Sequence, residues 1–211
     1  MPAIIIAGMI VVARLFLIPC ALLALSLPAA AKELLEVPAS REMEKAGPAS
    51  EAESHLDTLF AALAEARTAD EAESVAGRIN RELVTSNSPT VSLLMERALL
   101  AVSAEDYPLA LDLLDSVVLL APDFVEGWNK RATVYYLLDE LNLSLNDIEQ
   151  TLRLEPRHYG ALIGFGLIME KFEEKPAALK AYRKVLSIYP HNETATKHER
   201  DLSKDVEGVP L

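Results

Sequence analysis

Cysteine, glycine-rich loops and clustered histidines are scarce in this chain of 211 residues. Its one cysteine, Cys20, lies in an apolar stretch near the N-terminus, so no disulfide framework can form. Gly164 and Gly166 lack the third glycine and the preceding strand of a phosphate-binding loop, and no serine lies in a nucleophile elbow. The sequence therefore predicts no catalytic residue and no cofactor, and we expect the protein not to be an enzyme.

A metal site is also not expected. The four histidines lie apart, and no pair has the spacing of H-E-x-x-H or of a zinc module: His55, His158, His191 and His198. His158 and His191 fall between predicted helix pairs, where we expect them to be solvated loop residues.

Excess positive charge is absent as well. The chain has 32 acidic residues against 20 lysines and arginines, which gives a net charge of -12, and aromatic residues make up 6%. An acidic chain without a basic patch repels phosphate, and it has few rings on which bases could stack. Nucleic acid is therefore not an expected partner.

Charged side chains are nearly missing from residues 1–31, where Arg14 is the only one. An apolar run follows Arg14 and ends at Pro28 and a run of three alanines, Ala29–Ala31, which is typical of a secretory signal. The sequence predicts a signal peptide over 1–31, cleaved after Ala31, and an exported, periplasmic protein. The alternative is an uncleaved segment that anchors the protein in the inner membrane, facing the periplasm. Residues 32–54 have the charged, Pro-Ala-Ser composition of a flexible linker.

From about residue 55 the apolar pattern is helical and repeats with a period of 34 residues. Three columns share this period: Pro122, Pro156 and Pro190; Ala98, Ala132 and Gly166; Ala110, Ser144 and Ala178. Within the middle unit, Trp128, Arg131, Ala132 and Tyr135 precede Ser144, Ile148 and Pro156. This arrangement resembles the tetratricopeptide repeat (TPR), with its pattern W-x2-L-G-x2-Y, then A-x3-F, then P.

The resemblance implies an all-α protein, a right-handed α-solenoid of antiparallel helix pairs. The TPR domain would span 55–208, with clear repeats at 91–124, 125–158 and 159–192. A degenerate repeat at 57–90 and a capping helix at 193–208 would cover its ends, because a repeat cannot bury its apolar face alone. Arg131 departs from the leucine of the pattern, which predicts that it is partly exposed or paired with an acid.

In similar repeat proteins the first helix of each unit lines a concave surface that binds an extended peptide or a helix. The positions of this chain that correspond are mostly apolar: Met95, Leu99, Val102, Asn129, Thr133, Tyr136, Gly160, Ile163, Gly164 and Leu167. The lysine and asparagine set with which some members clamp a C-terminal carboxylate is missing. The predicted function is a non-catalytic protein-protein interaction module of the bacterial cell envelope, binding a peptide or an amphipathic helix of a partner protein. The alternative is a permanently docked subunit or assembly factor that uses its outer or terminal surface.

Overall fold

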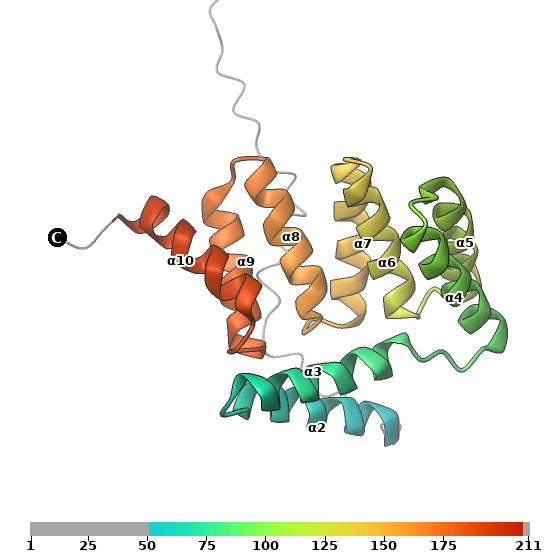
Figure 1. The fold of residues 1–211 in the computed structure, drawn as a ribbon, viewed down its shortest axis with the longest axis horizontal. Helices are drawn as coiled ribbons and strands as arrows, with labels where there is room; N and C mark the ends of the chain where they lie inside the picture. The colour runs from blue at the N-terminus through green and yellow to red at the C-terminus, as the bar shows by residue number, and fades with distance from the viewer. Residues whose placement is uncertain (1–50, 209–211) are drawn as a thin grey trace, which may run out of the picture.

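The computed structural model describes residues 51–208, and all the regular structure in this range is helical (Figure 1). The helices are α2 (Glu51–Glu65), α3 (Ala69–Val84), α4 (Pro89–Ser103), α5 (Tyr107–Leu120), α6 (Val125–Leu137), α7 (Leu141–Leu154), α8 (Tyr159–Lys171), α9 (Lys175–Ile188) and α10 (Glu193–Glu207). The predicted signal peptide and residues 32–50 of the predicted linker lie outside the described range. In that range no helix is both long and apolar enough to cross a bilayer.

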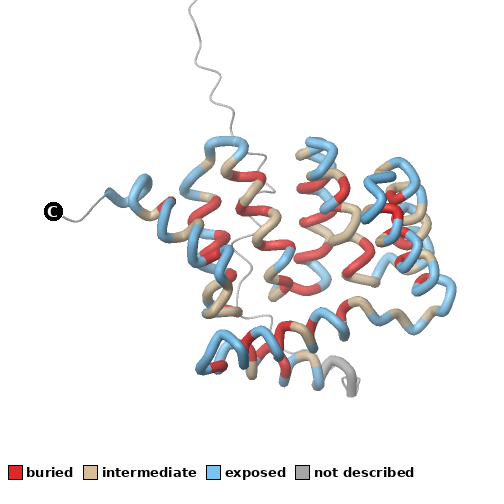
Figure 2. The backbone as a smooth tube through the Cα atoms, viewed as in Figure 1, coloured by how far each residue is buried: buried red, intermediate tan, exposed pale blue. Residues whose placement is uncertain are grey.

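Three antiparallel helix pairs, α4/α5, α6/α7 and α8/α9, stack side by side and confirm the predicted solenoid of helical repeats (Figure 1). The pairs α6/α7 and α8/α9 fall within the predicted repeats 125–158 and 159–192, whereas α4 begins two residues before the predicted repeat 91–124. The column of small residues is buried, with Ala98 0% and Ala132 3% exposed. At Gly166 an added Cβ would lie 2.7 Å from Cζ of Tyr182, so the second helix crosses the first too closely for a side chain. Buried residues accordingly line the interior of the stack (Figure 2).

The turn inside each pair has the same backbone in all three repeats. Glu105, Asp139 and Glu173 adopt left-handed φ angles of 58°, 61° and 60° and are spaced by one period. The residue after each one donates its N–H to a carbonyl five residues earlier, as in Asp106 to Ala101 at 2.9 Å. This hydrogen bond is that of the Schellman motif, which usually has glycine at the left-handed position. The three repeats therefore share turn geometry as well as side-chain pattern.

The C-terminal helix α10 covers the last repeat, as expected. Ala195 and Leu202 are 0% and 6% exposed. Asn192 caps the helix by accepting the N–H of Ala195, and Gly208, at φ 80°, follows its last residue. Outside this apolar contact, Arg183 of α9 pairs with Glu199 and with Glu207 of α10.

The N-terminal helix pair forms as predicted but packs in a different place. Thr68 caps α3 by accepting the N–H of Glu71. The pair lies along one edge of the stack, with α2 against α9 and α3 against α6, so it does not extend the stack beyond α4 as a further repeat (Figure 1). At the place where the other units have Leu114, Ile148 and Tyr182, this pair has Asn80, a polar residue that cannot fill a repeat core.

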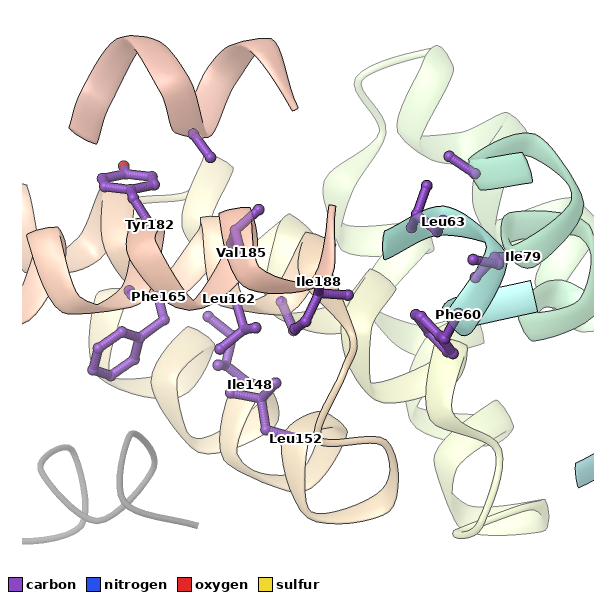
Figure 3. Close-up of a cluster of buried hydrophobic side chains, with 14 of the residues drawn as sticks. Phe60, Leu63, Ile79, Ile148, Leu152, Leu162, Phe165, Tyr182, Val185 and Ile188 are labelled. Atoms are coloured by element: carbon purple, nitrogen blue, oxygen red, sulfur yellow. The ribbon is translucent and has the colours of Figure 1, made fainter. Parts of the chain in front are cut away.

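Contacts far apart in sequence hold α2 and α3 against the stack. The hydroxyl of Tyr159 donates to Oδ1 of Asn80 at 2.7 Å. Arg157 pairs with Asp57 at 2.6 Å and lies over the ring of Phe60. Figure 3 shows Phe60, Leu63 and Ile79 in the same cluster as buried side chains of α7, α8 and α9. Because α2 begins at Glu51, residues 51–54 are helical and the predicted linker ends four residues early.

Candidate functional site

A hollow of about 190 Å³ opens between α6 and α8, with α7 beneath it. Its lining residues are Asn129, Ala132, Thr133, Tyr136, Ser144, Ile148, Gly160, Ala161, Ile163, Gly164 and Leu167. Side chains from α6 form one wall and residues from α8 the other. Ala132, Ser144, Ile148 and Ala161 are buried and form the floor. We call this hollow the groove.

Seven of the predicted positions line the groove. They are Asn129, Thr133 and Tyr136 on α6 and Gly160, Ile163, Gly164 and Leu167 on α8. The prediction missed the floor, although its signal was present: Ala132, Ser144 and Ile148 are themselves positions of the repeat pattern. The structure thus brings residues from two repeats together around one apolar surface.

The three predicted positions of α4 do not line the groove. Met95 is 2% exposed and belongs to a buried cluster with Val91 and Val134. Leu99 and Val102 are half-buried against the same cluster, which Val84 at the end of α3 also contacts. Met95 is therefore a core residue, and its assignment to a partner-binding surface was wrong. Val84 reaches this cluster because α3 packs against α6. No local sequence pattern predicts that packing.

Lys171 lies at one end of the groove, next to Tyr136. The ammonium of Lys171 lies 4.6 Å from the ring centroid of Tyr136 and pairs with Asp139 at 2.6 Å. The hydrogen bond from Lys171 to Asp139 raises the pKa of this lysine, which stays charged at neutral pH. Tyr136 is thus held in place by a cation on its face.

The opposite end carries a buried polar cluster. The side-chain amide of Asn129 donates to Glu126, which is 5% exposed, and Glu126 lies 3.7 Å from Nε2 of His158. Burial alone would raise the pKa of Glu126, but His158, Lys130 and Asn129 together lower it below its ordinary value. Glu126 is therefore ionised at neutral pH, and it holds the amide of Asn129 at the edge of the groove.

His158 belongs to this cluster and is not the solvated loop residue that the sequence predicted. It is 5% exposed, and its Nδ1 accepts the N–H of Ala161 at the start of α8. Nε2 has no hydrogen-bond partner among the described residues. The ring is therefore buried at the start of α8, where it caps the helix. His191, half-buried, contacts the carbonyl of Ala66. No group of three metal-ligating side chains gathers within residues 51–208.

Two of the three glycines of α8, Gly160 and Gly164, leave backbone accessible at the groove wall. At Gly164 an added Cβ would lie 3.4 Å from Cδ1 of Ile148, and at Gly160 it would lie 3.2 Å from Cε1 of His158. These two positions, one helical turn apart, carry no side chain, so an extended ligand can lie close to the helix.

Arg131, the predicted departure from the repeat pattern, is paired with acids as expected. Its guanidinium bonds both oxygens of Asp147 at 2.7 and 2.8 Å and Asp115 of the preceding repeat at 2.8 Å. The hydrogen bonds that it donates to Asp147 raise the pKa of Arg131. The guanidinium also lies over the ring of Trp128, whose indole N–H donates to the carbonyl of Pro122. These residues hold neighbouring repeats together and do not line the groove.

Comparison with known proteins places the chain among repeat proteins. It is 37% identical over 166 residues to a TPR repeat-containing protein of Rhizobium etli, covering 79% of this chain and 81% of that protein. It is 27% identical to the chloroplast TPR domain-containing protein PYG7 of Arabidopsis thaliana over 59% of this chain, and it spans 42% of that relative. The structure of the first TPR of Spaghetti (RPAP3) bound to an HSP90 peptide matches with a TM-score of 0.55 and 21% identity, covering 57% of this chain and 96% of that one. No family model matches the sequence.

Proposed function

Because the chain belongs to the tetratricopeptide repeat family, we propose that it is a non-catalytic interaction module that binds a peptide or an amphipathic helix in the groove. The observation that supports this most is the convergence of seven predicted contact positions, from α6 and α8, around one apolar hollow. An apolar groove between helices suits an extended or amphipathic segment, whose side chains enter it one by one.

The size of the groove favours a peptide side chain over a small molecule. Small-molecule sites usually enclose about 300–1,000 Å³, whereas this hollow has about 190 Å³. One or two apolar side chains would pack between Tyr136, Ile163 and Leu167, and the ligand backbone would pass close to Gly160 and Gly164. A similar fold, the first TPR of Spaghetti (RPAP3), is known with an HSP90 peptide bound.

Recognition of a C-terminal carboxylate is not part of the proposal. Such recognition needs charged donors that point into the groove. Here the Asn129 side chain is uncharged and donates one of its two amide N–H groups to Glu126, and the charged Lys171 is paired with Asp139. The ligand segment is therefore expected to lie within a chain, with apolar side chains supplying most of the affinity.

We further propose that the protein works in the bacterial cell envelope, exported through residues 1–31. N-terminal sequencing of the protein from its own cells should show Lys32 as the first residue of a periplasmic form. A membrane-bound protein that still carries residues 1–31 would instead support the anchored form facing the periplasm.

The test of the groove is capture of partners from the cell envelope after mild cross-linking, with three versions of the tagged protein. Tyr136→Ala combined with Ile163→Ser removes two groove walls, and Leu119→Ser changes a side chain of α5 that is 81% exposed. We expect one partner with the wild type and with Leu119→Ser, and its loss with the groove variant. Circular dichroism of the groove variant must show unchanged helix content.

A second candidate is the docked subunit, favoured by exposed leucines on the first repeat. Leu109, Leu119 and Leu120 of α5 are 46%, 81% and 59% exposed. In the same capture experiment, a partner that the groove variant keeps and that Leu119→Ser loses would move the function to this outer surface.

A further inference from the structure

The face of α4 that should carry a preceding repeat is open. In α6 the equivalent face packs on α5: Val134 is 0% exposed, and an added Cβ at Gly127 would lie 2.8 Å from Cγ1 of Val117. One period earlier, α4 presents Leu93 and Leu100, which are 50% and 64% exposed.

The third repeat shows that burial is the rule at these two positions. Ala161 and Ile168 of α8, one period after Gly127 and Val134, are 1% and 0% exposed. The face of α4 stays open because α2 and α3, which precede it in sequence, pack against α9 and α6 (Figure 1). We call this surface, formed by Leu93, Glu96, Arg97 and Leu100, the open face.

The charged residues of the open face also lack the partners that their equivalents have. Arg131 of α6 bonds Asp115 of the preceding repeat and Asp147 of its own. Arg97 occupies the same repeat position in α4, and neither Arg97 nor Glu96 forms an ion pair with another residue of the described range. Within residues 51–208, both the apolar and the charged positions of the open face are thus left without the packing and ion-pair partners that their equivalents have.

We propose that a second copy of the chain occupies the open face, so that the protein forms a two-fold dimer with its α4 helices side by side and parallel. Leu93 and Leu100 are seven residues, or about two turns, apart and lie on nearly the same side of the helix. Each leucine would pack on its own copy across the two-fold axis, in an isologous contact.

The charges of Glu96 and Arg97 favour a second copy of the chain as the partner, and they favour a parallel orientation of the two α4 helices. Glu96 and Arg97 lie on opposite flanks of the line that joins the two leucines, because neighbouring residues of a helix are about 100° apart. A two-fold axis parallel to the helices brings Glu96 of each copy next to Arg97 of the other, which gives two complementary pairs. An antiparallel arrangement would instead bring each charge next to its own copy, which is repulsive.

The first test is the mass of the full protein in solution, measured by sedimentation equilibrium over a range of concentrations. Wild type should form a reversible dimer whose fraction rises with concentration. Leu100→Asp should be monomeric, whereas the matched control Leu119→Asp, also on an exposed leucine of the same repeat, should dimerise like wild type. A wild type that stays monomeric, or a Leu100→Asp variant that still dimerises, would overturn the proposal.

Charge reversal tests the orientation. Glu96→Arg and Arg97→Glu should each raise the dissociation constant about tenfold, because two surface pairs become repulsive. The double variant Glu96→Arg with Arg97→Glu restores both pairs and should dimerise like wild type. Recovery in the double variant supports the parallel dimer, and a double variant as weak as the single ones contradicts it. Neither result bears on the groove, which lies between α6 and α8.

Discussion

The two ends of the solenoid are finished in different ways. At the C-terminal end, α10 covers α9, with Leu202 buried and the ring of His198 stacked 4.9 Å from that of Tyr182. At the other end Leu93 and Leu100 stay exposed, although a helix pair directly precedes them in sequence. A helix pair that directly precedes a repeat in sequence therefore does not necessarily cover the end of that repeat. The helix pair α2/α3, with Asn80 at a core position of the repeat, buries its apolar face elsewhere.

We expect the largest difference between the two ends in the free energy of unfolding that is lost when one leucine at each end is truncated to alanine. Leu202→Ala empties a packed site and should lower the free energy of unfolding by about 2–4 kcal/mol. Leu100→Ala removes an exposed side chain and should change it by less than about 0.5 kcal/mol. Urea unfolding at a concentration where the protein is monomeric measures both. Equal losses would mean that the open face is covered within the monomer.

Two glycines of α8 show how tightly the C-terminal end is packed relative to the groove. Gly166→Ala places a Cβ 2.7 Å from Cζ of Tyr182, whose hydroxyl donates to Glu170 at 2.6 Å. Because that ring cannot move freely, we expect a loss of about 1–3 kcal/mol. Gly164→Ala meets Cδ1 of Ile148 at an ordinary 3.4 Å. It should gain up to about 1 kcal/mol from helix propensity.

Thermal unfolding of the two variants tests this pair. A rise in melting temperature for Gly164→Ala with a fall for Gly166→Ala is expected. A fall of similar size for both variants would show that α8 is packed as closely at Gly164 as it is against Tyr182. That result would contradict an open groove beside Gly164.

The smallest expected effect is on the packing of α2 and α3 against the stack. The Tyr159 hydroxyl contributes to that packing through its hydrogen bond to Asn80. Burial raises the pKa of Tyr159 from 10.0 to about 12, with a further contribution from Tyr189. A raised pKa means that the folded state favours the neutral form. The stabilisation is therefore complete below pH 10 and is lost as the pH rises from about 10 to about 12.

Tyr159→Phe isolates this contribution from those of the other tyrosines. It removes the hydrogen bond to Asn80, so it should cost about 1 kcal/mol at pH 8. Between pH 10 and 12 its urea midpoint should fall less steeply than that of wild type. Parallel curves for the two proteins would show that Tyr159 is not buried by α3.

Repetition made much of the fold predictable. The columns through Ala98 and Pro122 repeat at 34 residues, which was enough to place three helix pairs and seven residues of the groove. The rest depends on contacts that no local pattern carries. The hydrogen bond between Tyr159 and Asn80 joins two residues that are 79 positions apart in the sequence, and it helps to position α3. Met95 has the register of a groove residue, yet it is buried in a cluster that Val84 contacts.

The most direct test of the account is to place a photoreactive amino acid at a single site and irradiate the living cells. With the reactive group in place of Tyr136, in the groove, we predict a cross-linked adduct with one partner protein. With it in place of Leu119, on the outer surface, no such adduct should form. An adduct at position 119 and none at position 136 would contradict the claim that the groove between α6 and α8 binds the partner.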